Sequence, residues 1–271
     1  MAAPRPDTRG IVEASDLFTH VRFRRREPAP ALRPYLEHYW LIDWDLTQPF
    51  VSHVVPHPSV NLVFQRFESG DEGERAGFAE VSGLGLGLFA QKLEGRGRVC
   101  GVQFRPGGFR PFAPGRPVSQ WTGLRLPADE VLSAPPSPAA VLDPEDEDAR
   151  IAALDRCLLS LGPHPDPGAD RAMAVAERVR ADRSLLRVGQ LARAEGLSVR
   201  SLQRLFSTYV GVGPKWVILR YRIHEALERA ESDPKTDWAA LAADLGYSDQ
   251  AHLVRDFTAT VGAPPTAFAP R

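Results

Sequence analysis

An internal repeat in the last hundred residues constrains the fold of this chain more than any other feature. Leu191-Ala192 is followed by Gly196-Leu197-Ser198. Fifty positions later the same residue types recur as Leu241-Ala242 and Gly246-Tyr247-Ser248. Beyond the second serine the offset becomes fifty-one, which a single inserted residue explains; the pairs matched there are Leu202 and Leu253, Arg204 and Arg255, Phe206 and Phe257, Gly211 and Gly262, and Pro214 and Pro265. Such a repeat indicates two copies of one supersecondary unit.

Each copy is predicted to form two short helices with a glycine turn between them. Apolar residues at helical spacing predict the first helices over 188–195 and 238–245. Gly196 and Gly246 stand where those helices end, since glycine adopts the left-handed conformation at little cost. The sequence therefore places a sharp turn after each first helix.

A second helix with a capped start is expected after each turn. Ser198 and Ser248 follow their glycines by two residues, where a side-chain oxygen can accept a hydrogen bond from the first turn of a helix. The matched leucines and phenylalanines then give each second helix an apolar face. Helix, glycine turn and capped helix together are the helix-turn-helix pattern, whose second helix enters the major groove of DNA.

A longer helix is predicted between the two copies, from Pro214 to Glu231. Pro214 suits the first turn of a helix, and Ser232-Asp233-Pro234 ends it. Its expected apolar stripe consists of Trp216, Leu219, Ile223, Ala226, Leu227 and Ala230. Such a helix is about 27 Å long at 1.5 Å per residue. It can therefore hold two readers near the spacing of one DNA turn, about 34 Å.

The polar residues of the second helices distinguish a DNA reader from a purely structural helical repeat. Val199-Arg200 and Gln203-Arg204 lie at the start of the first one. Asp249 and Gln250 lie at the start of the other, and Arg255 lies further along it. Arginine and glutamine are the side chains that read guanine and adenine edges by paired hydrogen bonds. The pattern therefore favours double-stranded DNA as the partner.

Residues 170–270 resemble the DNA-binding domain of AraC/XylS-type transcription regulators. The segments that carry the resemblance are Leu191-Ala192, Gly196-Leu197-Ser198, Leu202-Gln203-Arg204-Leu205-Phe206, Gly211-Val212-Gly213-Pro214, Leu245-Gly246-Tyr247-Ser248-Asp249-Gln250, Phe257, Val261-Gly262, Pro265 and Phe268. The resemblance implies sequence-specific DNA binding and control of transcription. It assigns Arg200, Gln203 and Arg204 as base readers of the first unit, and Ser198 is counted with them among the DNA-binding residues. It assigns Asp249, Gln250 and Arg255 to the second, with activation or repression left open.

Two departures from the family pattern concern the second unit and the linker. Ala251-His252-Leu253 replaces the usual serine or threonine followed by His-Phe. The linker helix has fewer basic residues than is usual in the family and carries Glu225, Glu228 and Glu231. We therefore expect the second unit to contribute more to positioning on DNA than to base specificity.

The first half of the chain is predicted to be rich in β-structure. Short runs of β-favouring residues predict strands over 21–24, 60–65 and 99–104, the last followed by a turn at Pro106-Gly107-Gly108. The segment 30–40 has apolar spacing that predicts a helix at its start. The expected fold class is therefore α+β, with a β-rich N-terminal domain followed by an all-α domain of two helix-turn-helix units.

Changes in composition mark the expected domain boundaries. Residues 133–148 are rich in alanine, proline and acid and predict an exposed connector. A helix is expected over 149–161, and residues 162–168, with three prolines and two glycines, predict a second connector. We therefore divide the chain into a β-rich domain (1–132), connectors (133–169) and a DNA-binding domain (170–271).

Segments 54–64 and 95–108 resemble an N-terminal domain of undetermined function often found ahead of this DNA reader. That resemblance implies a β-rich sensor for an unknown small molecule and leaves RNA polymerase and a second copy of the chain open as partners. A protein-interaction or dimerisation module and a fused enzyme domain are the alternatives. An enzyme would need a nucleophile–base pair or a metal cluster in residues 1–131, and none is visible, so neither catalysis nor a cofactor is expected.

Composition sets broad limits on this interpretation. The net charge is -1, but residues 168–271 hold 15 Lys and Arg against 12 Asp and Glu, a weak basic bias. No run of eighteen apolar residues and no secretory signal are present, which predicts a cytoplasmic protein without membrane contact. Cys100 and Cys157 lie far apart and are expected to be reduced thiols, although one disulfide stays open.

Several weaker motifs have both a structural and a functional interpretation. The glycine-rich segments 83–87 and 95–101 lack dinucleotide-binding spacing and predict turns. His53 and His57 favour structural roles over a metal site, because the adjacent prolines deny them a common helix face. Trp40, Trp44, Phe50, Phe64 and Trp121 could line an effector pocket, with ordinary core favoured. Cys100, in a predicted strand, favours a buried inert thiol over an oxidant sensor.

Overall fold

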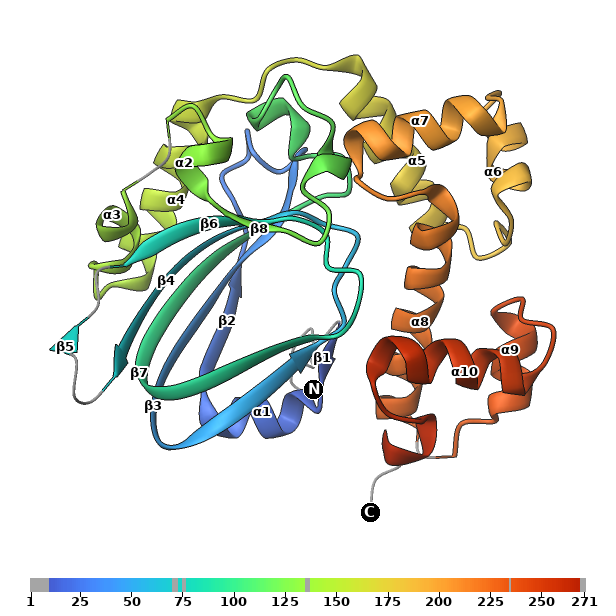
Figure 1. Ribbon diagram of the computed structural model, residues 1–271, viewed down its shortest axis with the longest axis horizontal. Helices are drawn as coiled ribbons and strands as arrows, with labels where there is room; N and C mark the ends of the chain where they lie inside the picture. The colour runs from blue at the N-terminus through green and yellow to red at the C-terminus, as the bar shows by residue number, and fades with distance from the viewer. Residues whose placement is uncertain (1–9, 70–72, 75–76, 135–136, 234, 269–271) are drawn as a thin grey trace.

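A β-sheet domain and a helical domain lie side by side, as the α+β prediction required (Figure 1). The computed structural model describes residues 10–69, 73–74, 77–134, 137–233 and 235–268. The strands are β1 (Ile11–Val12), β2 (Arg22–Arg26), β3 (Leu36–Val54), β4 (Asn61–Ser69), β5 (Gly73–Glu74), β6 (Phe78–Ser82), β7 (Phe89–Phe104) and β8 (Arg125–Pro127). The helices that accompany them are α1 (Ala14–His20), α2 (Ala128–Val131), α3 (Pro138–Leu142) and α4 (Glu147–Leu161), with 3-10 turns η1 (Arg110–Phe112) and η2 (Val118–Gln120).

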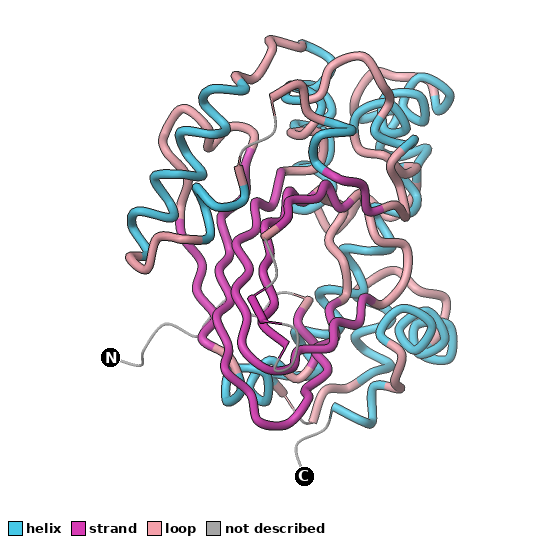
Figure 2. The backbone as a smooth tube through the Cα atoms, turned by 60° about the vertical axis from the view of Figure 1, so that its left-hand side comes forward, coloured by secondary structure: helices cyan, strands magenta, loops and turns pink. Residues whose placement is uncertain are grey.

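The described strands form one antiparallel sheet in the order β1-β3-β7-β4-β6-β8, with β2 paired to β3 and β5 to β4. The long strands β3 and β7 pair over nearly their whole length, from Leu36 opposite Phe104 to Val54 opposite Phe89. Register shifts interrupt this pairing between Leu36 and His38 and between Leu46 and Phe50. Bulges bend strands, and Figure 2 shows the strands curving so that the sheet has an inner and an outer side.

Side chains on the two sides of the sheet belong to different cores, because successive residues of a strand point to opposite faces. On the outer side Leu41, Phe64 and Val102 are fully buried in the main core with residues of α3 and α4. On the inner side Trp44 and Val63 pack in a separate cluster with Leu17 and other residues of β1 and α1. The sheet is thus covered on both faces, and its inner face closes around the cavity described below.

The predicted helix at the start of residues 30–40 is wrong. Residues 30–35 form a turn, with Leu36 N–H bonded to Leu32 O at 3.0 Å, and β3 begins at Leu36. The spacing of Leu32, Tyr35 and Leu36 that suggested a helix face has another origin. Leu32 from the turn and Leu36 from the strand are buried in the main core, and Tyr35 is partly buried against it.

The turn predicted over 95–101 is also wrong, whereas residues 83–88 do form a loop. Gly97 and Gly101 lie within β7, opposite Trp44 and Trp40 on β3. A Cβ on Gly97 would clash with the Trp44 indole, and one on Gly101 would clash with Trp40. These glycines therefore make room for two tryptophans on the inner face of the sheet.

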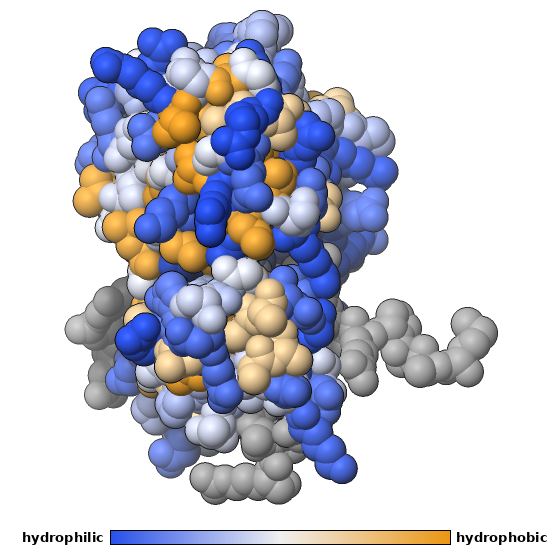
Figure 3. All heavy atoms as spheres, turned by 90° about the vertical axis from the view of Figure 1, so that its right-hand side faces the viewer, coloured by the Kyte–Doolittle hydropathy of each residue, from blue (hydrophilic) through white to orange (hydrophobic). Residues whose placement is uncertain are grey.

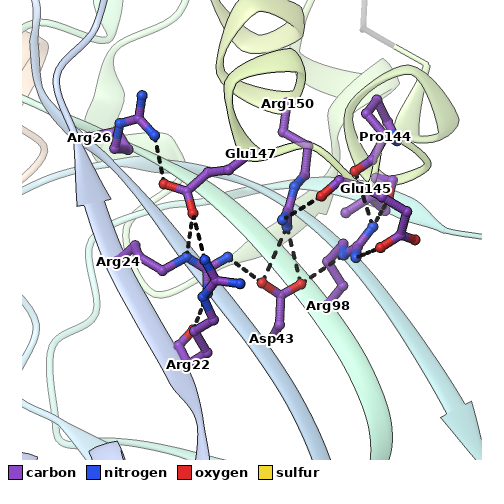
Figure 4. A network of polar contacts seen from close by, with 10 residues as sticks. Arg22, Arg24, Arg26, Asp43, Arg98, Pro144, Glu145, Glu147 and Arg150 are labelled. Carbon is purple, nitrogen blue, oxygen red and sulfur yellow. Dashed lines mark hydrogen bonds and ion pairs between the residues drawn. The ribbon is translucent and has the colours of Figure 1, made fainter.

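Part of the expected connector over 133–148 is folded against the sheet. Helix α3 places Val141 and Leu142 in the main core, with 1% and 0% exposure. The helix expected over 149–161 begins two residues earlier, as α4, capped by Asp146. Arg150 of this helix contacts Asp43 of β3, and three arginines in all converge on that carboxylate (Figure 4).

The Asp43 cluster consists of Asp43 and the guanidinium groups of Arg24, Arg98 and Arg150. Arg98 Nε donates to Asp43 Oδ1 at 2.8 Å, Arg150 Nη1 donates to the same oxygen at 3.1 Å, and Arg24 bonds to Oδ2. Burial pushes the pKa of Asp43 up, but the hydrogen bonds from Arg24 and Arg98 and the charge of Arg150 outweigh it and hold that pKa below its ordinary value. The cluster ties β2, β3 and β7 to α4.

The helical domain contains α5 (Pro167–Ala181), α6 (Val188–Ala194), α7 (Val199–Tyr209), α8 (Pro214–Ser232), α9 (Trp238–Asp244), α10 (Gln250–Val261) and the 3-10 turn η3 (Pro265–Phe268). The helices predicted over 188–195, 238–245 and Pro214–Glu231 are confirmed to within one residue at each end. The main core extends from the sheet into this domain, where it includes Leu191, Leu202 and Phe206. A second core joins α8, α9 and α10.

Candidate DNA interface and ligand cavity

The first helix-turn-helix unit is α6, a turn at Gly196 and α7. Gly196 has a φ of 62°, the left-handed conformation that the sequence predicted for a glycine at this turn. Ser198 caps α7, because its Oγ accepts from Ser201 N–H at 3.1 Å, as predicted. Leu202 and Phe206 are fully buried beneath the helix. The turn and the cap thus fix the start of α7 at the residue after Ser198.

The predicted base readers of the first unit share one exposed face of α7. Arg200, Gln203 and Arg204 are all exposed. None of them takes part in a hydrogen bond or ion pair with another residue that the structure describes. Their donors are therefore available to the edge of a base or to a phosphate.

The second unit is α9, a turn at Gly246 and α10, and its cap differs from the prediction. Gly246 has a φ of 71°, as expected for the turn. Asp249, not Ser248, caps α10, with Oδ1 accepting from His252 N–H at 2.8 Å. Ser248 Oγ instead donates to Asp249 Oδ2 at 3.0 Å. The residue inserted after the serine in this copy moves the helix start, and with it the cap, by one position.

The capping bonds fix the charge and the hydrogen-bond partners of the Asp249 carboxyl in the free protein. The N–H of His252 and the hydroxyl of Ser248 hold the pKa of this carboxyl below its ordinary value. The carboxylate is thus charged and engaged at the start of α10. Gln250 and Arg255, the other two readers predicted for this unit, are exposed.

Helix α8 joins the units and buries two polar side chains that the predicted stripe did not include. Ile223, Ala226, Leu227 and Ala230 are buried as expected, whereas Trp216 and Leu219 are only half-buried. Arg220 and His224 are 5% and 4% exposed. Arg220 Nη2 donates to Leu86 O at 2.8 Å, and burial lowers its pKa to about 10. Both residues meet the sheet domain, a contact that helical spacing cannot reveal.

Seen from its outer side, the helical domain presents hydrophilic side chains interleaved with apolar ones in an upper and a lower lobe (Figure 3). The upper lobe corresponds to the first unit and the lower lobe to the second, as their places in Figure 1 indicate. Helix α8 connects them along the side that faces the sheet (Figure 1). The two units are thus arranged along one edge of the molecule.

The inner face of the sheet holds a cavity of about 230 Å³. Most of its lining is apolar and includes Phe23, Trp40, Ile42, Trp44, Val63, Phe67, Leu93 and Val99. Polar groups also line it, with the Glu80–Arg125 ion pair among them. Of the five aromatic residues singled out in the sequence, Trp40 and Trp44 line this cavity, whereas Phe64 and Trp121 belong to the main core. The fifth, Phe50, is partly buried against the inner cluster that contains Trp44 and does not line the cavity.

A larger and more polar cleft of about 460 Å³ lies between the sheet domain and the helical domain. Five residues line both spaces: Arg25, His38, His57, Ser59 and Gln103. Across the cleft they face α8, which contributes Tyr221, Arg222 and His224. The cavity inside the sheet therefore adjoins the linker helix of the helical domain.

His53 lies on β3, and His57 stacks on His224 of α8. In the part of the chain that the structure describes, no group of three or more His, Cys, Asp or Glu is arranged to hold a metal ion. The structure contains no disulfide, and both thiols are free. Cys100 is buried, as predicted, and burial raises the pKa of Cys100 to about 11 and that of Cys157 to about 12. Among the described helices, none has both the length and the apolarity to cross a membrane.

Two protein-family models match this chain, one within its first half and one within its second half. Residues 24–127 match a domain of unknown function (DUF6597), and residues 191–271 match a helix-turn-helix domain. No curated protein sequence matches the chain. The two matches cover most of the sheet and most of the two units found in the structure.

Solved structures with an overall likeness to this chain include three of ToxT from Vibrio cholerae. The apo form of a variant from strain SCE256 is 10% identical, covering 90% of this chain and 98% of that one, with a TM-score of 0.43. ToxT of strain O395 is 8% identical, covering 91% and 96%, with a TM-score of 0.42. Wild-type ToxT bound to an unsaturated fatty acid is 10% identical, covering 90% and 96%, with a TM-score of 0.41.

Proposed function

We propose a function for this chain from the premise that it carries an AraC-type helix-turn-helix domain behind a DUF6597 domain. It is a sequence-specific DNA-binding transcription regulator, controlled by a small molecule bound in the sheet domain. The observation that carries the proposal is the pair of capped helices α7 and α10, each with an exposed glutamine and exposed arginine in its first half.

The two units are expected to read DNA together. The N-terminal residues of a recognition helix contact base edges, and contacts to phosphates hold the protein in register. Helix α8 has 19 residues and is therefore about 28 Å long. That length, with the widths of the units, suits two successive major grooves about 34 Å apart on one face of the duplex.

The two units are expected to contribute unequally to specificity. Arg200, Gln203 and Arg204 are exposed and uncommitted on α7. In the second unit Asp249 serves as the helix cap, which leaves Gln250 and Arg255 as the better candidates for base contact. The first unit therefore supplies most of the base discrimination, and the second adds position and affinity.

The cavity in the sheet supports a ligand sensor over the alternatives of an interaction module or a fused enzyme. Small-molecule sites are concave and mostly apolar, with a few polar groups at fixed places, and this cavity fits that description. Its wall is shared with the cleft that faces α8, so a bound molecule lies close to the element that joins the readers. RNA polymerase and a second copy of the chain are further partners of a regulator of this kind.

In vitro selection with the full chain on random duplexes tests the DNA-binding part of the proposal. Arg204→Ala is expected to weaken binding to the selected site by about 1–3 kcal/mol and to relax base preference at the position it reads. Arg156→Ala, which also removes one exposed positive charge but lies on α4, is the matched control and should bind as wild type. Unchanged specific affinity of Arg204→Ala would remove this residue from the reading face.

A thermal-shift screen of small apolar compounds tests the sensor part. Val63 is 7% exposed and lines the cavity, so Val63→Phe fills space that a ligand would occupy. A compound that raises the Tm of the wild-type chain and not that of Val63→Phe is expected. Compounds that stabilise both proteins equally would place the binding site elsewhere.

A further inference from the structure

The loop between β6 and β7, residues 83–88, runs along the side of the sheet that faces α8 (Figure 1). Its sequence alternates glycine and leucine from Gly83 to Leu88. Gly83 and Gly85 line the cavity, while the side chains of Leu84 and Leu88 and the carbonyl of Leu86 contact the helical domain. We call residues 83–88 the strap.

Leu84 attaches the strap to the first unit. Its side chain is fully buried in the main core together with Phe206 and Val210 of α7 and its C-cap. Gly211, which follows α7 with a φ of 102°, approaches so closely that an added Cβ would lie 3.0 Å from Leu84 Cδ1. Next to this contact, Thr122 Oγ1 donates to Gly211 O at 2.8 Å. The end of α7 is thus held by one apolar and one polar contact.

The centre of the strap is bonded to the linker helix. Leu86 O accepts from Nη2 of Arg220, whose guanidinium also lies over the Trp216 ring, 4.4 Å from its centroid. The Leu86 side chain itself is 53% exposed. This contact therefore depends on the Leu86 carbonyl and not on its side chain.

Leu88 attaches the strap to the second unit. It packs against the core of α8, α9 and α10. Gly262, the C-cap of α10 with a φ of 83°, lies so near that an added Cβ would be 2.9 Å from Leu88 Cδ2. Both outer leucines thus contact the C-terminal ends of the second helices. The opposite, N-terminal ends of these helices begin at Val199 and Gln250 and carry the residues proposed to meet the bases.

We infer that the strap positions the two reading units relative to each other by contacting the C-terminal ends of their second helices, with Leu84 and Leu88 as positioning residues. The inference rests on the proposed DNA-binding function. A link that holds two modules at the spacing of their sites raises the effective concentration of the second module once the first is bound. The strap supplies such a link in addition to α8, since it contacts the first unit, the linker and the second unit in turn. Because Gly83 and Gly85 line the cavity, the same segment borders the proposed ligand.

The test compares Leu88→Ala with Leu86→Ala in the full chain. Both changes remove the same atoms from the same loop, but only Leu88 packs against the second unit. Binding is measured on the duplex selected by the wild-type chain, on the half-site of the first unit alone, and on a duplex with one base pair inserted between the half-sites.

The positioning role predicts a distinct pattern of affinities. Leu88→Ala loses about 3- to 10-fold in affinity for the complete site, binds the half-site as wild type, and tolerates the inserted base pair better than wild type. Thr122→Val, which removes the hydrogen bond to Gly211 with little change in volume, should show the same pattern more weakly. Leu86→Ala should match the wild type on all three duplexes.

Other outcomes would overturn the inference in recognisable ways. Wild-type affinity of Leu88→Ala for the complete site would mean that the strap does not position the units. Equal losses on the complete site and the half-site would mean that Leu88 only stabilises the fold. Failure of the wild-type chain to select any sequence would overturn the proposed function itself, and with it the positioning role.

Discussion

The imidazole of His57 stacks on that of His224, with ring centroids 3.9 Å apart and planes within 8° of parallel. His57 belongs to the connection between β3 and β4, which lines the cavity, and His224 belongs to α8. Nearby, Nε2 of His224 lies 3.3 Å from Pro56 O, and Val55 is buried in the core of the second unit. The stack is therefore part of the contact through which the sheet domain meets the linker helix.

Removing the His224 ring should weaken that contact. A stacked ring pair contributes about 0.5–1.5 kcal/mol beyond the area it buries. We expect His224→Ala to lower the free energy of unfolding by at least that amount, and His224→Phe to recover part of it because the ring is kept. Urea unfolding of the three proteins gives the comparison. Equal stability of the alanine and phenylalanine variants would mean that the ring contact contributes nothing.

Glu231, at the C-terminal end of α8, should make stability depend on pH. Burial, followed by the charge of Glu228, raises its pKa to about 7, despite a hydrogen bond from the backbone of Glu13. A carboxyl with a raised folded pKa holds its proton in the folded state when the unfolded state has lost it. Stability therefore falls as pH rises from the ordinary value of 4.5 to about 7.

The variant Glu231→Gln should remove this part of the pH dependence. We expect it to be more stable than wild type by about 1–2 kcal/mol at pH 8 and nearly equal to it at pH 4.5. The measurement is the free energy of unfolding at both pH values. If the free energies of unfolding of wild type and variant differ by the same amount at both pH values, the pH dependence comes from other groups.

Asp43 should be among the most sensitive positions of the sheet domain. Its neutral analogue Asp43→Asn would leave Arg150, whose side chain is 3% exposed, without its carboxylate partner. Breaking a buried pair in this way costs about 3–5 kcal/mol, and the partial exposure of Asp43 favours the lower figure. Asp143→Asn, whose carboxyl is 60% exposed beside Arg66, is the control and should cost less than 1 kcal/mol. A similar loss in both variants would contradict the assigned burial.

The depressed pKa of Asp43 adds a direction with pH. Its stabilising contribution is complete above the ordinary pKa of an aspartate and is lost as pH falls through the lower, folded value. The difference in stability between wild type and Asp43→Asn should therefore shrink in strong acid. A difference that stays constant down to pH 2 would argue against a charged Asp43 in the folded protein.

The caps of the two units can be compared directly. Replacing an N-cap side chain by alanine costs about 0.5–2 kcal/mol. We expect that loss for Ser198→Ala in the first unit and for Asp249→Ala in the second, but a smaller one for Ser248→Ala, which supports the cap without forming it. Urea unfolding measures all three. A larger loss in Ser248→Ala than in Asp249→Ala would contradict the shifted cap.

The sequence predicted the helical domain well because its structure is dictated locally. Gly196 and Gly246 need a left-handed backbone, and their neighbours supply the caps and apolar faces within a few residues. The Ser248 prediction failed for an equally local reason, since the inserted residue moves the helix start by one. Periodicity within α8 could not reveal Arg220, because the partner that justifies its burial, the Leu86 carbonyl, lies 134 residues away in the chain.

The sheet domain was harder to predict because its patterns depend on distant partners. Gly97 and Gly101 look like turn residues until Trp44 and Trp40 are placed opposite them on β3. Likewise Leu32 and Leu36 have helical spacing but lie on either side of a strand start. The cavity follows from the curvature of the whole sheet, so no single segment could indicate it.

The final prediction concerns Val199, the first residue of α7, which is 43% exposed. Among the described residues of the helical domain it is the one large apolar side chain with such exposure, and it adjoins Arg200. In the major groove the apolar feature is the C5-methyl group of thymine. If the start of α7 meets base edges as proposed, Val199 should prefer thymine at one position of the selected site. Replacing that thymine by uracil should then weaken wild-type binding about 3- to 10-fold and leave Val199→Ala unaffected, because only the methyl group is removed. Equal losses in both proteins, or none in either, would show that Val199 contacts no base.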